Sequence, residues 1–150
     1  MTRFVAALLL LGIAACTDLA LPVPHLARLD FDARSTSGEG RPAALTSASS
    51  SSPEVQVQGG AKRIVVRGRI RTPNPCQNVS AVLVPLGRDL RLDVTARRTG
   101  DGCPDVIGTF TYQAVVDGLP AGRYRVRVRH LCPGTGWETR TVLDHPVWVR

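Results

Sequence analysis

Two-residue alternation of apolar and polar side chains dominates the chain from residue 53 onward. The stretch Gly118–His130 reads GLPAGRYRVRVRH, and in its second half tyrosine and valine alternate with arginine. Successive side chains of a β-strand point to opposite faces of the sheet, so such a stretch buries one row and exposes the other. A sustained 3.6-residue period is found nowhere in the sequence. The alternation therefore predicts an all-β domain.

The same alternation predicts which side chains form the core and which face water. Four segments carry an apolar row, and burial of these rows supplies most of the folding free energy. The expected core residues are Ile64, Val66, Ile70, Leu90, Leu92, Val94, Phe110, Tyr112, Ala114, Tyr124, Val126 and Val128. The arginines between them, expected on the outside, are Arg67, Arg69, Arg71, Arg123, Arg125, Arg127 and Arg129.

Turn signals divide the alternating region into short strands. Gly59-Gly60 and Gly87-Arg88 predict two hairpins, and the stretch from Asp117 to Gly122 predicts a third. The end of the chain predicts two short strands, interrupted at 144–146. Short strands at this spacing predict a β-sandwich or a barrel, with the domain spanning residues 53–150.

A short motif narrows the choice to a sandwich. The sequence GLPAGRYRVRV is similar to the Leu-Pro-x-Gly-x-Tyr-x-Val-x-Val signature of many bacterial immunoglobulin-like modules, including carboxypeptidase-regulatory-like and fibronectin type III-like domains. The matching residues are Leu119, Pro120, Gly122, Tyr124, Val126 and Val128. The resemblance implies an immunoglobulin-like antiparallel β-sandwich of about seven to eight strands, and it implies no activity.

The first residues have the pattern of an export signal. Arg3 is followed by an apolar run from Phe4 to Ala15, too short for a transmembrane helix of about 20 residues. Ile13-Ala14-Ala15-Cys16 resembles the lipobox of bacterial lipoproteins. The resemblance implies that residues 1–15 are removed and that Cys16 carries the lipid that anchors the protein to a membrane of the cell envelope. An ordinary signal peptide with a chance cysteine is the alternative.

Residues 16–52 have the composition of a linker. They are rich in serine, threonine, glycine and proline, with weak apolar periodicity, and such a segment buries too little surface to offset its loss of conformational entropy. We expect the lipidated cysteine and a disordered tether here, with local folding conceivable only around 26–31.

Three further cysteines remain, and an exported protein is expected to form disulfides. If residues 77–86 and 89–98 form a hairpin, Cys76 and Cys103 both lie in turns at its base, which favours the Cys76–Cys103 disulfide. Cys132 is then free, buried or paired with another molecule.

The sequence carries no recognised catalytic, cofactor or metal motif. Asp101 and Asp105 flank Cys103 but are ordinary turn formers, and the three histidines lie in separate segments. We therefore expect a protein that is not an enzyme, with no cofactor and no metal site.

Charge suggests the class of partner. Nineteen lysines and arginines stand against 12 acidic residues, for a formal net charge of +7. We expect a non-catalytic domain with a structural role or an interaction role in the cell envelope. The alternatives are an arginine surface that binds anionic polymer or lipid headgroups, and a regulatory or accessory domain of an envelope enzyme. Nucleic acid is not an expected partner, because export removes that target and aromatic residues are sparse.

Overall fold

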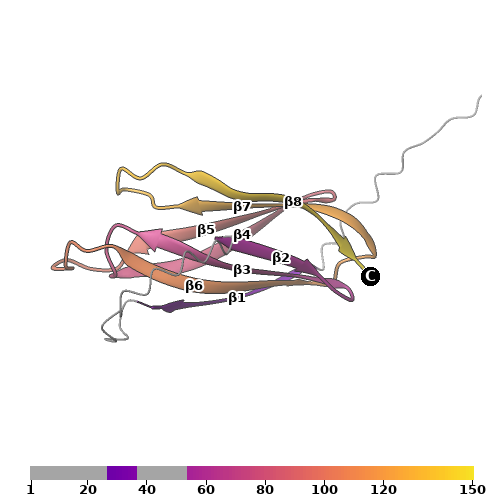
Figure 1. The fold of residues 1–150 in the computed structure, drawn as a ribbon, viewed down its shortest axis with the longest axis horizontal. Coiled ribbons are helices and arrows are strands. Elements are labelled where there is room, and N and C mark those ends of the chain that lie inside the picture. The colour runs from indigo at the N-terminus through magenta and orange to yellow at the C-terminus, as the bar shows by residue number, and fades with distance from the viewer. Residues whose placement is uncertain (1–26, 37–53) are drawn as a thin grey trace, which may run out of the picture.

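The computed structural model describes residues 27–36 and 54–150, which form eight strands in two packed sheets (Figure 1). Sheet A has the strand order β1 (Arg28–Ser35), β6 (Gly108–Asp117), β3 (Arg63–Thr72) and β2 (Val55–Gly59). Sheet B has the order β4 (Gln77–Leu86), β5 (Asp89–Arg98), β7 (Gly122–Leu131) and β8 (Arg140–Val149). The expected all-β sandwich is confirmed.

The core between the sheets is built from the rows that the alternation selected. All twelve of the expected core residues are buried, and Phe110 is the most exposed of them at 6%. On β3, Gly68 continues the inner row and leaves room for an aromatic ring, because a Cβ at this position would lie 2.4 Å from the hydroxyl oxygen of Tyr112. The arginines of β3 and β7 lie on the solvent side of their sheets.

The hairpins β2–β3 and β4–β5 are confirmed, but the expected third hairpin is wrong. β6 pairs with β1 and β3, whereas β7 lies in the other sheet. The connecting residues 118–121 cross between the layers, and Leu119 is inserted into the core with 1% of its surface exposed. A loop that buries its own leucine is a crossover between sheets, which turn residues alone do not distinguish from a hairpin loop.

One neighbouring pair of strands departs from the expected antiparallel arrangement. β5 and β7 run parallel, with Leu90 opposite Val126 and Leu92 opposite Val128. The crossover explains this direction: the chain leaves sheet B after β5, reverses through β6 in sheet A, and reverses again on its return as β7.

The linker predicted for residues 16–52 is wrong for Arg28–Ser35, which form β1 at the edge of sheet A. Leu29, Phe31 and Ala33 pack against the core as an inner row, and the Phe31 ring stacks on Tyr112 at 5.9 Å. The alternation in LDFDAR is a strand signal, but it is short and stands among linker-like residues. The sandwich therefore begins before residue 53.

The end of the chain forms one strand where two were expected. β8 runs without a break through Asp144 and Pro146 and pairs with β7, with an irregularity in the pairing between Val128 and Arg129. An edge strand tolerates proline, because the missing N–H can face away from the ladder.

On one side of the sandwich, main-chain hydrogen bonds join sheets A and B at one end. The N–H of Lys62 donates to the carbonyl of Arg150 at 2.8 Å, and the N–H of Arg150 donates to the carbonyl of Gly60 at 3.0 Å. Gly59 permits this contact, since a Cβ there would lie 1.9 Å from the carbonyl oxygen of Trp148. Towards the other end, where β2 begins at Val55, a cleft opens between residues of the two sheets.

Cys76 and Cys103 form the expected disulfide, with an S–S distance of 2.05 Å, and Cys132 is a free buried thiol. The predicted signal peptide, the lipobox-like residues with Cys16 and most of the predicted linker lie outside the described residues. Within 27–36 and 54–150, no helix is long and apolar enough to span a membrane.

Candidate anion-binding surfaces

The seven arginines expected to bind anions do not form one surface. Arg67, Arg69 and Arg71 belong to β3 in sheet A, whereas the other four belong to β7 in sheet B. Both sets point away from the core, and the two sheets form opposite layers of the sandwich (Figure 1). The arginines therefore form two separate surfaces with different neighbours.

On the outer face of sheet B, Asp144 of β8 neutralises much of the arginine charge. Arg125 donates two hydrogen bonds to its carboxylate, at 2.6 and 2.8 Å. Arg127 lies 3.3 Å from the same carboxylate and 3.9 Å from that of Asp89. The hydrogen bond from Arg125 lowers the pKa of Asp144 and raises that of Arg125. One aspartate thus pairs with two neighbouring arginines of the β7 row.

Asp93 of β5 pairs in the same way with the next arginine of the β7 row, Arg129. Arg129 donates two hydrogen bonds to its carboxylate at 2.8 and 2.7 Å, and Arg91 lies 3.4 Å away. The hydrogen bond from Arg129 lowers the pKa of Asp93, even though burial acts in the opposite direction. Bidentate arginine–carboxylate pairs are the strongest of the surface ion pairs. Arg125, Arg127 and Arg129 on this face already have anionic partners.

Arg123 differs from the other arginines of β7. It lies opposite Trp148, which is 67% exposed, and it has no acidic partner in the described part of the chain. Its neighbour Arg88 lies over the Tyr124 ring, 5.7 Å from the centroid. This end of sheet B retains cationic charge, at the opposite end of β7 from Arg129.

The arginines of β3 have few acidic neighbours. Arg67 donates a hydrogen bond to the side-chain oxygen of Gln113 at 2.8 Å, and among the described residues Arg69 and Arg71 have no carboxylate partner. Thr111 of β6 lies between Arg69 and Arg34 of β1 in the pairing register, so these side chains share one face. We call Arg34, Arg67, Arg69 and Arg71 the sheet A arginine face.

The only acid paired with this face in the described residues is Asp32, whose carboxylate lies 3.1 Å from Arg34. Both side chains are largely exposed, at 66% and 81%, so water screens the pair and its net attraction is weak. The sheet A arginine face therefore keeps a positive charge that is available to a ligand, unlike the row on β7.

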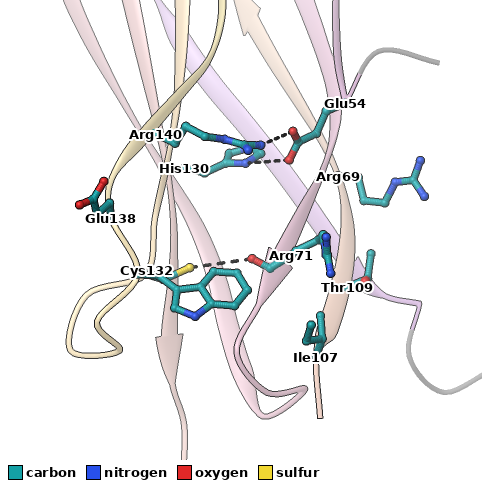
Figure 2. A pocket seen from close by; sticks show the side chains of 10 residues that line it. Glu54, Arg69, Arg71, Ile107, Thr109, His130, Cys132, Glu138 and Arg140 are labelled. Carbon is teal, nitrogen blue, oxygen red and sulfur yellow. Dashed lines mark hydrogen bonds and ion pairs between the residues drawn. The ribbon is translucent and has the colours of Figure 1, made fainter. Parts of the chain in front are cut away.

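A cleft of about 730 Å³ opens beside this face, where β2 ends and the sheets separate. Its lining comes from β3, β6, β7 and β8, from the residues just before β2 and β6, and from the loop after β7, as Figure 2 shows for the labelled residues. The lining residues are Glu54, Arg69, Arg71, Ile107, Thr109, His130, Cys132, Trp137, Glu138 and Arg140.

Glu54, His130 and Arg140 converge at one wall of the cleft (Figure 2). The Glu54 carboxylate forms an ion pair with Arg140 and lies 3.7 Å from Nδ1 of His130. Nε2 of His130 hydrogen-bonds the buried hydroxyl of Tyr112 at 3.0 Å. Burial, assisted by the nearby Arg140 charge, lowers the pKa of His130 to about 4. The imidazole is therefore neutral at pH 7 and engaged in the protein's own contacts.

Cys132 shares the cleft with His130 but lacks the features of a reactive thiol. Burial raises its pKa, and its sulfur lies 4.0 Å from the main-chain oxygen of Arg71. A thiol is activated by a lowered pKa, so this environment opposes nucleophilic chemistry at neutral pH. No group of three or more His, Cys, Asp or Glu side chains in the described residues is placed to hold a metal ion.

The acidic partners of the β7 arginines were not predicted from the sequence. Asp89 and Asp93 lie on β5 and Asp144 lies on β8, and only the pairing of these strands with β7 brings them beside its arginines. Glu54 was missed for the same reason, since it meets His130 only across the two sheets.

Comparison with known proteins adds no further assignment: no protein-family model, no curated protein and no solved structure matches this chain.

Proposed function

We propose that this protein is an exported lipoprotein whose β-sandwich is a non-catalytic module that binds an anionic polymer of the cell envelope through the sheet A arginine face. The class of ligand is a polymer with repeated phosphate or carboxylate groups. Arginine suits this role, because its planar guanidinium forms paired hydrogen bonds with either group.

One observation carries the proposal: of two arginine rows with the same sequence pattern, only that of β3 lacks carboxylate partners. Arg69 and Arg71 have none in the described part of the chain, while Arg125, Arg127 and Arg129 are paired with Asp144 and Asp93. Arginines that already pair with carboxylates of the same protein have little net charge left to attract an anionic ligand. The threonines and Gln113 beside the β3 row add hydrogen-bonding groups without negative charge.

Export and lipidation rest on the residues before the sandwich. The lipobox-like Ile13-Ala14-Ala15-Cys16 and the short apolar run before it support a lipid on Cys16. Mass spectrometry of the protein purified from membranes tests this: we expect an N-terminal Cys16 carrying acyl chains, and a Cys16→Ser variant found in the soluble fraction. An unmodified Cys16 in membrane-extracted protein would contradict the anchor.

The finer assignment of the sandwich as immunoglobulin-like is also part of this proposal. Its support is the Leu-Pro-x-Gly-x-Tyr motif, in which the Tyr124 hydroxyl donates a hydrogen bond to the carbonyl oxygen of Pro120 at 2.9 Å. A tyrosine bonded to the backbone a few residues upstream is a recurring feature of immunoglobulin-like sandwiches.

Chromatography on an immobilised polyanion such as polyphosphate tests the binding surface. We expect the Arg69→Gln/Arg71→Gln variant to elute at clearly lower salt than the wild-type protein. The matched control is Arg125→Gln/Arg127→Gln, which removes the same charge from sheet B and is expected to elute closer to the wild-type protein.

Two further binding experiments identify the class of ligand and test the proposal. A carboxylated polysaccharide column and vesicles containing phosphatidylglycerol distinguish a polymer from lipid headgroups, and the proposal requires stronger retention by polymer. Equal elution of the two double variants would show that net charge alone controls retention, and the proposed surface would then be rejected.

A further inference from the structure

The four edge strands of the sandwich differ in how they are protected against pairing with other strands. An edge strand carries unpaired N–H and C=O groups, and proteins protect such edges with charge, proline, irregular pairing or short length. β1 and β2 are the edges of sheet A, and β4 and β8 are the edges of sheet B.

Three of these edges carry recognisable protection. β1 has charged side chains at alternate positions from Arg28 to Arg34. β2 is only five residues long and is joined to the end of β8 by the hydrogen bonds between the Gly60–Lys62 turn and Arg150. β8 contains Asp144 and Pro146, and its pairing with β7 is irregular.

β4 lacks most of this protection. Its ten residues, QNVSAVLVPL, contain no charged side chain. Val82 and Leu86 are 59% and 58% exposed, although large apolar side chains are usually buried. Only Pro85, next to the end of the strand, is a residue that discourages pairing.

The pairing of β4 with β5 determines which backbone groups remain open. The carbonyl of Cys76 accepts a hydrogen bond from the N–H of Thr99 at 3.1 Å, just before the first residue of the strand. Because hydrogen-bonded and open residues alternate in an antiparallel pair, the N–H and C=O groups that point outward belong to alternate residues. These residues are Gln77, Val79, Ala81 and Leu83, and Pro85 follows them without an N–H.

We propose that β4 pairs antiparallel with β4 of a second copy of this chain, about a two-fold axis that passes through Ser80. This register places Val79 opposite Ala81 of the other copy and Gln77 opposite Leu83, so all the open groups of these residues find partners. Pro85 falls outside the paired run. The two copies of sheet B become one continuous sheet.

A second copy is the partner that the strand itself favours. Like charges directly opposite each other destabilise a strand pair, and self-pairing about a two-fold axis brings every charge of the strand into the interface twice. The charged β1 would meet such conflicts more readily, whereas the uncharged β4 has none. The dimer also places Val82 of each copy beside Asn78 of the other, which covers part of the exposed apolar surface.

Charge reversal at the axis tests the proposal. Ser80 is exposed, so lysine or glutamate is compatible with the folded monomer, which thermal unfolding checks. Sedimentation of the purified chain in mild detergent should show a dimer for the wild-type protein. We expect Ser80→Lys and Ser80→Glu each to raise the dimer dissociation constant by about fivefold or more, since two like charges then face each other. An equimolar mixture of the two variants should restore the dimer.

Engineered cysteines test the register. Ser80→Cys should form a disulfide-linked dimer under mild oxidation, because position 80 meets itself at the axis. The matched control, Asn78→Cys, is on the same face of the same strand but lies opposite position 82, and should cross-link much less.

A monomeric wild-type protein, or a dimer that both charge variants leave unchanged, would overturn the proposal. Equal cross-linking of the two cysteine variants would reject the register. None of these outcomes depends on polyanion binding, which uses the other sheet.

Discussion

β3 and β7 have nearly the same arginine spacing but different surroundings. In both strands arginine occupies alternate positions outside an apolar row. β7 lies between β5 and β8, which bring Asp93 and Asp144 to its arginines, whereas β3 lies between β2 and β6, which bring glutamine and threonine. The comparison teaches that an arginine row becomes either a ligand surface or an internal ion-pair network according to the neighbouring strands.

The largest expected effect is a loss of stability at low pH, caused by His130 on the inward side of β7. The pKa of His130 is about 4 in the folded protein against about 6.5 in an unfolded chain, so the unfolded state binds more protons between these values. The contribution of His130 to the free energy of unfolding should be present in full well above pH 6.5 and fall by about 2–3 kcal/mol as the pH drops towards 4.

Urea denaturation at a series of pH values measures this fall. A His130→Gln variant retains a polar group facing Tyr112 and should lose most of the pH dependence in that window. If the variant and the wild-type protein lose stability in parallel, the acid sensitivity arises elsewhere, for example in the aspartates outside β7.

The second prediction compares stability on the two outer faces. Asp93→Asn removes the carboxylate that Arg129 and Arg91 share, and the Asp93 side chain is only 15% exposed. We expect a loss of about 1 kcal/mol in unfolding free energy, because two partly buried guanidinium groups lose the negative charge and one of the two acceptor oxygens that they share. Arg69→Gln on β3 should change stability by less than about 0.5 kcal/mol. Equal losses in chemical denaturation would mean that the two rows do not differ energetically.

The smallest expected effect is a gain of polyanion binding by the arginines of β7 when Asp144 is replaced. Asp144→Asn frees Arg125 and Arg127, so β7 should come to resemble β3 and bind polyanions more strongly. We expect elution from the polyphosphate column at moderately higher salt. The matched control Asp101→Asn makes the same change of charge in an exposed turn away from both arginine rows, and should shift elution less. If Asp144→Asn elutes with the wild-type protein, the β7 arginines are unavailable for another reason.

The sequence alone predicted the parts of this protein that depend on local geometry. Alternation of side chains across a strand requires only the chain itself, so the buried rows on β3, β5, β6 and β7 were identified correctly. Two hairpins and the Cys76–Cys103 disulfide followed as well, since each depends on residues that one short loop brings together.

The tertiary structure decided everything that depends on which strands are neighbours. It placed β6 and β7 in different sheets, added β1 to sheet A, and brought Asp93 and Asp144 to one arginine row and not to the other. The physical reason is that alternation determines the face to which a side chain points, whereas the residue beside it is determined by long-range strand pairing, which a local pattern does not encode.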